Sequence, residues 1–218
     1  MSPVYRTIVY IDGYNLYHGI RRMYKSPDTL YDPHRWREAL WLDIARLSES
    51  FLNPAQELAL VKYFTARVTS PRSKMERQND YLDVLYSLPK VRIIEGKYHD
   101  NNPVVCQHCG KTSFVSKEKQ TDVNLTTELL VDAIENNFDS AYLVTADSDY
   151  KAPLEYIRNK LPEKRIFMEF VESNFSNILA RLTYRTYMIK RERLLQCQLP
   201  ETVVLPSGYK ITRPAKWE

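Results

Sequence analysis

Short apolar runs with the character of β-strands alternate along this chain with amphipathic segments of ten or more residues. Strands separated by helices of this length pair in parallel, because the chain must cross the sheet to return to the same end. The alternation therefore predicts an α/β fold in which a mostly parallel sheet of about five strands lies between two layers of helices. The expected strands are residues 7–11, 57–68, 91–94, 140–145 and 165–171.

The expected helices are marked by apolar residues at three- and four-residue steps, and the last of them by Ser173 as an N-cap. They are residues 14–23, 32–50, 73–88, 122–137, 150–160 and 173–195. Residues 97–118 follow no periodic pattern and are expected to form a loop insertion. Residues 196–218 contain three prolines and are expected to be an extended tail packed on a single domain of residues 1–195.

Glycine is scarce, and this excludes two common nucleotide-binding folds. The chain has only five glycines, and no three of them stand in the G-x-G-x-x-G spacing of a dinucleotide-binding fold. Gly110-Lys111-Thr112 matches the end of a phosphate-binding loop, but Val105 stands where that motif needs its first glycine. The net charge of +4, from 31 basic and 27 acidic residues, is too small to establish a nucleic-acid partner.

The start of the chain and its cysteine content favour a cytoplasmic protein. Asp12 is reached without the basic and then apolar stretch of a secretory signal, and no uncharged apolar run approaches 18 residues. Three cysteines, an odd number, do not form the disulfide framework of a small secreted protein. We therefore expect a soluble cytoplasmic protein with no membrane partner. The sequence leaves homo-oligomerisation open.

Four aspartates fall at the ends of the predicted strands and helices. Asp12 follows the first strand, and Asp147 and Asp149 follow the fourth. Asp122 opens the helix that precedes the fourth strand. The carboxyl ends of parallel strands meet at one edge, where α/β sheets bind their ligands. Each aspartate alone is also an ordinary cap or turn residue, but the four together favour a cation site.

Clustered carboxylates repel one another and raise one another's pKa unless a cation compensates their charge. Mg²⁺ and Mn²⁺ prefer oxygen ligands, and an ion held in this way can activate water against a phosphodiester. The aspartates therefore predict a Mg²⁺ or Mn²⁺ site suited to phosphodiester hydrolysis.

Three segments that carry these aspartates resemble the NYN domain family. They are YIDGYNL at residues 10–16, KQTDVN at residues 119–124 and VTADSDY at residues 144–150. More closely, the chain resembles the bacterial LabA/DUF88 branch of that family, which is related to PIN-domain nucleases. The resemblance extends over residues 5–190, and residues 206–218 are similar to tails in the same branch.

This resemblance implies a PIN-like α/β/α sandwich and a ribonuclease that depends on Mg²⁺ or Mn²⁺. Carried over to this sequence, the metal ligands and catalytic residues are Asp12, Asp122, Asp147 and Asp149. Asn15 of the first segment would position a metal-bound water or the substrate. The insertion at residues 97–118 is less typical of the family.

Basic residues near the predicted site could contact RNA phosphates. Arg67 and Arg72 lie at and just past the end of the second strand, and Lys119 lies three residues before Asp122. We predict that these three side chains contact the substrate. Residues 181–193 are also basic and rich in tyrosine, but the solvated face of an amphipathic helix is the favoured interpretation there.

Cys106 and Cys109 form a C-x-x-C motif, which is half of a zinc site. A structural zinc site needs four ligands, and the nearest further ones are His99 and His108, with Cys197 far along the chain. A pair of free thiols on a loop is therefore favoured, and bound Zn²⁺ is kept as the alternative.

Other functions fit the sequence less well than a metal-dependent ribonuclease that hydrolyses RNA. A non-catalytic RNA-binding or regulatory module would gain nothing from acids beside phosphates. A nucleotide-sugar transferase could use Asp147 and Asp149 as its D-x-D motif, but this leaves Asp12 and Asp122 unexplained. A phosphatase of the haloacid dehalogenase type needs a second aspartate where this chain has Tyr14.

Overall fold

Six strands pair in parallel to form one central sheet. The computed structural model describes residues 4–23, 35–105, 108–110 and 112–217, without the side chains of residues 35, 98–104 and 113–119. The strand order is β3-β2-β1-β6-β7-β8, and every neighbouring pair is parallel. The strands are β1 (Tyr5–Asp12), β2 (Gln56–Thr65), β3 (Val91–Glu95), β6 (Ser140–Val144), β7 (Arg165–Val171) and β8 (Arg185–Ile189).

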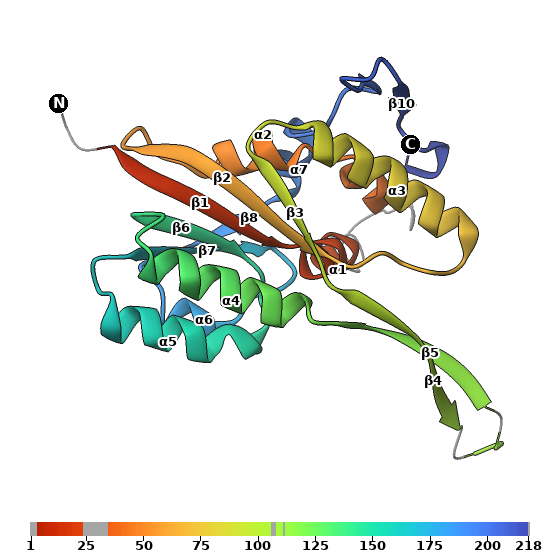
Figure 1. Ribbon diagram of the computed structural model, residues 1–218, viewed down its shortest axis with the longest axis horizontal. Coiled ribbons are helices and arrows are strands. Elements are labelled where there is room, and N and C mark those ends of the chain that lie inside the picture. The colour runs from red at the N-terminus through yellow and green to blue at the C-terminus, as the bar shows by residue number, and fades with distance from the viewer. Residues whose placement is uncertain (1–3, 24–34, 106–107, 111, 218) are drawn as a thin grey trace.

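Helices cover both faces of this sheet, so the predicted α/β/α sandwich is confirmed (Figure 1). One face carries α1 (Gly13–Met23), the 3₁₀-helix η1 (Arg35–Leu40), α2 (Ile44–Glu49), α3 (Arg72–Ser87) and α7 (Arg191–Gln196). The other face carries α4 (Thr121–Ile134), α5 (Lys151–Lys160) and α6 (Asn177–Ala180). No helix in the described residues is long and apolar enough to cross a membrane.

The central strand β1 shows why both layers are needed. Val9 and Ile11 belong to the core on the α1 and α3 side, whereas Ile8 and Tyr10 belong to the core on the α4 and α5 side. Successive side chains of a strand point to opposite faces, and all four are buried. A run such as TIVYI therefore lacks the alternation of polar and apolar residues of a half-exposed strand, because it is covered from both sides.

The chain reverses its direction of travel across the sheet between β1 and β6. From β1 it moves outward to β2 and β3, and it then returns to β6 and continues to β7 and β8. The connections that leave β1 and β6 begin on opposite faces, with α1 on one and α5 on the other. This is a topological switch point, and its crevice lies at the carboxyl ends of β1 and β6.

The predicted long helix over residues 173–195 is wrong. The segment instead contains α6, the edge strand β8 and α7. Ser173 donates its hydroxyl to the carbonyl of Gly19 instead of capping a helix, and Ser176 caps α6. Residues 185–189 pair with β7, so tertiary pairing overrides the helical pattern and adds a sixth strand.

Three other segments differ from the sequence-based expectation. Where a loop insertion was expected, β4 (Lys97–Val105) and β5 (Thr112–Lys119) pair as the strands of a hairpin that extends away from the body (Figure 1). Within the described part of residues 32–50, η1 and α2 replace one helix, and Asp43 caps α2. The tail forms a hairpin of β9 (Thr202–Val204) and β10 (Lys210–Thr212), followed by the 3₁₀-helix η3 (Ala215–Trp217). The division of the chain at residue 195 stays a prediction.

Candidate metal centre

Three aspartates converge at the switch point. Asp122 lies in the first turn of α4, Asp147 lies three residues after the end of β6, and Asp149 lies in the 3₁₀-helix η2 (Ser148–Tyr150). One carboxylate oxygen from each lies within 4.8 Å of the others. Like charges at this separation repel, and an all-oxygen set of this kind suits a hard divalent cation.

Local hydrogen bonds hold the loop after β6 in place. Asp147 caps η2, because its Oδ1 accepts a hydrogen bond from the backbone N–H of Asp149 at 3.0 Å. The backbone N–H of Asp147 donates in turn to the hydroxyl of Thr145 at 3.2 Å. This cap fixes the backbone conformation at Asp147 and Asp149.

Asp12 is buried, with 5 % of its surface exposed, and it does not belong to the group of three. Its Oδ1 accepts a hydrogen bond from the backbone N–H of Asn15 at 2.9 Å, and its Oδ2 accepts one from the hydroxyl of Thr145 at 3.1 Å. The pKa of Asp12 is raised to about 6, chiefly by burial and also by the charges of Asp122 and Asp147, while the two hydrogen bonds oppose the rise. The role of Asp12 as a metal ligand stays a prediction.

Tyr150 and Thr145 belong to the site, although sequence reasoning did not single them out. The buried hydroxyl of Tyr150 donates a hydrogen bond to Oδ1 of Asp122 at 2.8 Å and so connects η2 to α4. Burial raises the pKa of Tyr150 far above its ordinary value, and the neighbouring carboxylates add to the rise, so the hydroxyl stays a neutral donor. The only sequence signal for either residue is its place in the segment VTADSDY.

Asn15 connects three parts of the switch point. Its Oδ1 accepts hydrogen bonds from the backbone N–H of Ala146 at 3.1 Å and from Nδ2 of Asn174 at 3.0 Å. These bonds join the start of α1 to the loops that follow β6 and β7. The side chain therefore positions the strand ends, and its predicted contact with water or substrate stays a prediction.

The three predicted RNA contacts differ in how available they are. The guanidinium of Arg67 forms a salt bridge with Glu95 at 2.9 Å and donates to Asn79 at 2.8 Å, so a phosphate would have to compete with a carboxylate. The side chain of Arg72 is 90 % exposed, and it pairs with Glu76 one helical turn away. Lys119 ends β5, and its side chain lies outside the described part of the chain.

The zinc hypothesis stays a prediction. Cys106 lies outside the described residues, and Cys109 is an exposed free thiol. Cys197 packs in the hydrophobic core on the α1 and α3 side, so it belongs to the interior of the protein.

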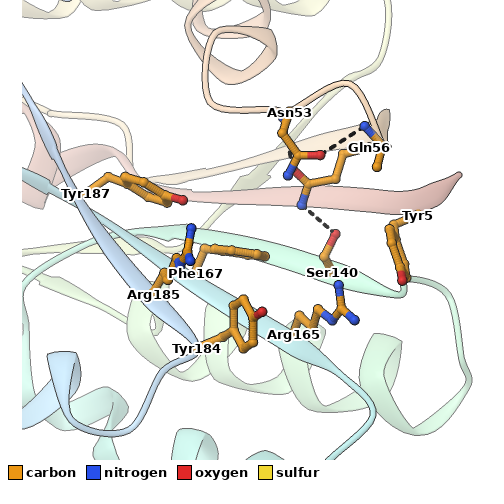
Figure 2. A pocket seen from close by; sticks show the side chains of 10 residues that line it. Tyr5, Asn53, Gln56, Ser140, Arg165, Phe167, Tyr184, Arg185 and Tyr187 are labelled. Carbon is orange, nitrogen blue, oxygen red and sulfur yellow. Dashed lines mark hydrogen bonds between the residues drawn. The ribbon is translucent and has the colours of Figure 1, made fainter.

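Figure 2 shows a small pocket of about 160 Å³. It lies at the amino ends of the strands, opposite the end that carries the carboxylates. Tyr5, Ser140 and Arg165 line it from the first residues of β1, β6 and β7. The Arg165 guanidinium lies 4.6 Å from the ring centroid of Tyr5, and Gln56 donates a hydrogen bond to Ser140 at 3.0 Å. These contacts account for the pocket as packing between strand ends.

A parallel sheet with acids at its switch point defines a PIN-like α/β protein. The family model of the NYN domain matches residues 6–188, and the chain belongs to this family, which is part of the PIN-like nuclease superfamily. The family predicted from the sequence is confirmed, and the assignment to the LabA/DUF88 branch stays a prediction.

Two individual proteins are similar to this chain. The 6-hydroxy-3-succinoylpyridine 3-monooxygenase HspA of Pseudomonas putida (strain DSM 28022 / S16) is 26 % identical over 251 residues, which cover 99 % of this chain and 76 % of that protein. The crystal structure of VPA0982, a protein of unknown function from Vibrio parahaemolyticus RIMD 2210633, has a TM-score of 0.54 at 16 % identity. That match covers 88 % of this chain and 97 % of the other, and it supports the fold.

Proposed function

We propose that this protein is a Mg²⁺- or Mn²⁺-dependent ribonuclease that hydrolyses RNA phosphodiester bonds. The observation that carries the proposal is the group formed by Asp122, Asp147 and Asp149, with oxygens within 4.8 Å of one another at the switch point of a parallel sheet. Membership of the NYN family, whose members are generally nucleases, supports it.

The residues present fit a hard divalent cation. Asp122, Asp147 and Asp149 would hold the ion, and the buried Asp12 would add a fourth negative charge beside them. When bound, such an ion polarises a phosphodiester, activates water and stabilises the leaving oxygen. The carboxylates alone would repel a phosphate, so the acids are useful to a nuclease only together with a cation.

The chain's own residues keep the site in shape for this chemistry. The Tyr150 hydroxyl donates a hydrogen bond to Oδ1 of Asp122 and does not engage Oδ2. Thr145 and the backbone N–H of Asn15 hold the carboxylate of Asp12 from both sides. These fixed bonds orient the acids before an ion or a substrate arrives, which lowers the cost of reorganisation during the reaction.

Incubation of the purified protein with labelled RNA, with and without Mn²⁺, tests the proposal. We expect cleavage only with the metal, and a loss of orders of magnitude in Asp147→Asn. Asparagine keeps an oxygen that can cap η2, so this variant removes the charge and keeps the local fold. Asp83→Asn, at an exposed position of α3, is the matched control and should cleave like the wild type.

A non-catalytic RNA-binding module on the same fold is the alternative within this family. It replaces the proposal if the wild type binds RNA and cuts none with any metal tried, while Asp147→Asn changes neither property.

The relative from Pseudomonas putida raises a second candidate function, because its name describes a monooxygenase that acts on 6-hydroxy-3-succinoylpyridine. A monooxygenase consumes O₂ and an electron donor. Oxygen uptake should therefore be measured with that pyridine and a reduced nicotinamide. Uptake that requires both compounds, without RNA cleavage in Mg²⁺ or Mn²⁺, would favour this function over the nuclease.

A further inference from the structure

A groove of about 480 Å³ lies beside the carboxyl ends of β1 and β2, on the face of the sheet that carries α1 and α3. Residues of α1, η1, α3 and η3 line it, together with the last residues of β2. Its volume falls within the range of about 300–1,000 Å³ that is usual for pockets that hold small organic ligands. None of the four aspartates of the proposed metal site lines this groove.

Aromatic rings form much of the wall. Tyr17 of α1 packs edge to face with Trp36 of η1, with ring centroids 5.5 Å apart. Tyr81 of α3 packs in the same way with Trp217 of η3, at 5.8 Å. Tyr17, Trp36 and Trp217 are only half-buried, although rings of this size usually gain free energy from full burial. Partly exposed rings in a groove are suited to stacking on a planar ligand.

The charge of the wall is of one sign. Among the described residues, the lining includes five arginine and lysine residues and no aspartate or glutamate, although the chain as a whole has 31 basic and 27 acidic residues. Lys74, Arg77 and Lys216 form no ion pair within the described part of the chain. The guanidinium carbons of Arg21 and Arg37 each lie 5.8 Å from the ring centroid of Trp36. Such a surface favours a ligand that carries negative charge.

The groove begins one residue away from the metal site. Gly13, which directly follows Asp12, lies in its wall. A Cβ atom at Gly13 would lie 2.6 Å from the ring of Tyr63 and 2.8 Å from the carbonyl oxygen of Phe64. The glycine therefore lets the start of α1 lie directly against the end of β2, and this contact places the aromatic wall next to Asp12.

We propose that this groove is a nucleotide subsite in which an unpaired base of single-stranded RNA stacks on Trp36 while Lys74, Arg77 and Lys216 contact its phosphates. The proposal rests on the proposed nuclease function and adds a surface, outside the group of acids, that contacts its RNA substrate. Bases within a duplex remain stacked on their neighbours, so only an unpaired base can enter an aromatic groove.

Binding without divalent metal tests this subsite apart from catalysis. Fluorescein-labelled single-stranded RNA of 12 nucleotides is titrated in EDTA across a salt series, and anisotropy is measured. In the double variant Lys74→Ala/Arg77→Ala, affinity should fall on the order of tenfold, and the salt slope should fall by about 1.4, at about 0.7 per phosphate contact. Lys160→Ala, at an exposed position of α5, is the matched control and should bind like the wild type.

The ring is tested separately. Trp36→Ala should weaken binding on the order of tenfold, while Trp36→Phe, which keeps an aromatic face, should restore most of the affinity. In the wild type, AMP should quench tryptophan fluorescence and compete with the RNA more strongly than adenosine, which lacks the phosphate. The AMP measurement keeps the proposal testable if Trp36→Ala fails to fold.

The outcomes separate the subsite from the nuclease. RNA cleavage by the wild type with unchanged binding in the Lys74/Arg77 and Trp36 variants overturns the subsite and leaves the nuclease standing. Binding that depends on these residues, without cleavage in any metal, supports the subsite and overturns the nuclease. Tight binding of a small aromatic carboxylate such as nicotinate, with no binding of RNA or AMP, overturns the nucleotide as the ligand.

Discussion

Replacement of Asp12 by asparagine should stabilise the metal-free protein at neutral pH. Burial, together with the charges of Asp122 and Asp147, raises the pKa of this carboxyl from 3.8 to about 6, so the fold disfavours its charged form. A rise of about two pKa units corresponds to a cost on the order of 3 kcal/mol of folding stability when the group is ionised. Asp12→Asn removes the charge and keeps the acceptor for the backbone N–H of Asn15.

The sign of the effect depends on pH in a defined way. Below pH 3.8 the carboxyl is protonated in both the folded and the unfolded chain, and the cost is absent. As the pH rises from 3.8 to about 6, the unfolded chain loses its proton first, so the stability of the wild type falls. Above pH 6 the full cost is present. The bond from Thr145 to Oδ2 must reverse in the variant, at a cost of about 1 kcal/mol, so we expect a net gain of about 2 kcal/mol at pH 8.

Urea unfolding in EDTA at pH 4.5, 6 and 8, followed by circular dichroism, measures this difference. Asp139→Asn is a control of opposite sign, because hydrogen bonds from Arg6 lower the pKa of Asp139 and its charged form stabilises the fold. That variant should lose stability at pH 8. The reasoning is refuted if Asp12→Asn is less stable than the wild type at pH 8. It is also refuted if the difference in stability between the two proteins does not change with pH.

Three further predictions concern the metal, the packing of α1 and the thiols. Millimolar Mn²⁺ should raise the melting temperature of the wild type and raise that of Asp147→Asn much less, and identical melting curves with and without Mn²⁺ would contradict the metal site. Gly13→Ala should cost about 1–3 kcal/mol in urea unfolding, because its Cβ would overlap the ring of Tyr63; an unchanged midpoint would show that the contact relaxes freely. If Cys106 and Cys109 bind zinc, protein purified without chelator should contain about one equivalent, lost in Cys106→Ser, and zinc-free protein of normal stability would exclude the site.

The convergence of the acids could be predicted from the sequence because it follows from parallel pairing. Asp12 ends one strand and Asp147 follows another. Because the strands are parallel, both residues lie at the same edge of the sheet, and this does not depend on the side chains between them. The three segments that resemble the NYN family indicate the same aspartates. Local pattern and topology were sufficient for this part of the site.

Features that depend on the register between distant elements could not be predicted. Residues 185–189 fit a helix by their spacing, and only pairing with the exposed edge of β7 makes them a strand. Arg67 looked available to phosphate, but β2 and β3 pair so that Thr65 is opposite Glu95, and that carboxylate engages the arginine. The bond from Tyr150 to Asp122 joins residues 28 positions apart, and nothing in the local sequence indicates it.

The order of the acids along the chain has a consequence for folding. Asp122, Asp147 and Asp149 lie within residues 122–149, a stretch that runs from the first turn of α4 through β6 into η2. Asp12, in contrast, bonds to Thr145 across 133 residues. Contacts between distant parts of a chain are slow to form, because a large loop must close first. In refolding experiments, the three nearby acids can gather locally, while the burial of Asp12 requires β1 to pair with β6. The raised pKa of Asp12 therefore reports on the pairing of β1 with β6, whereas the approach of the other three acids reports on one continuous segment.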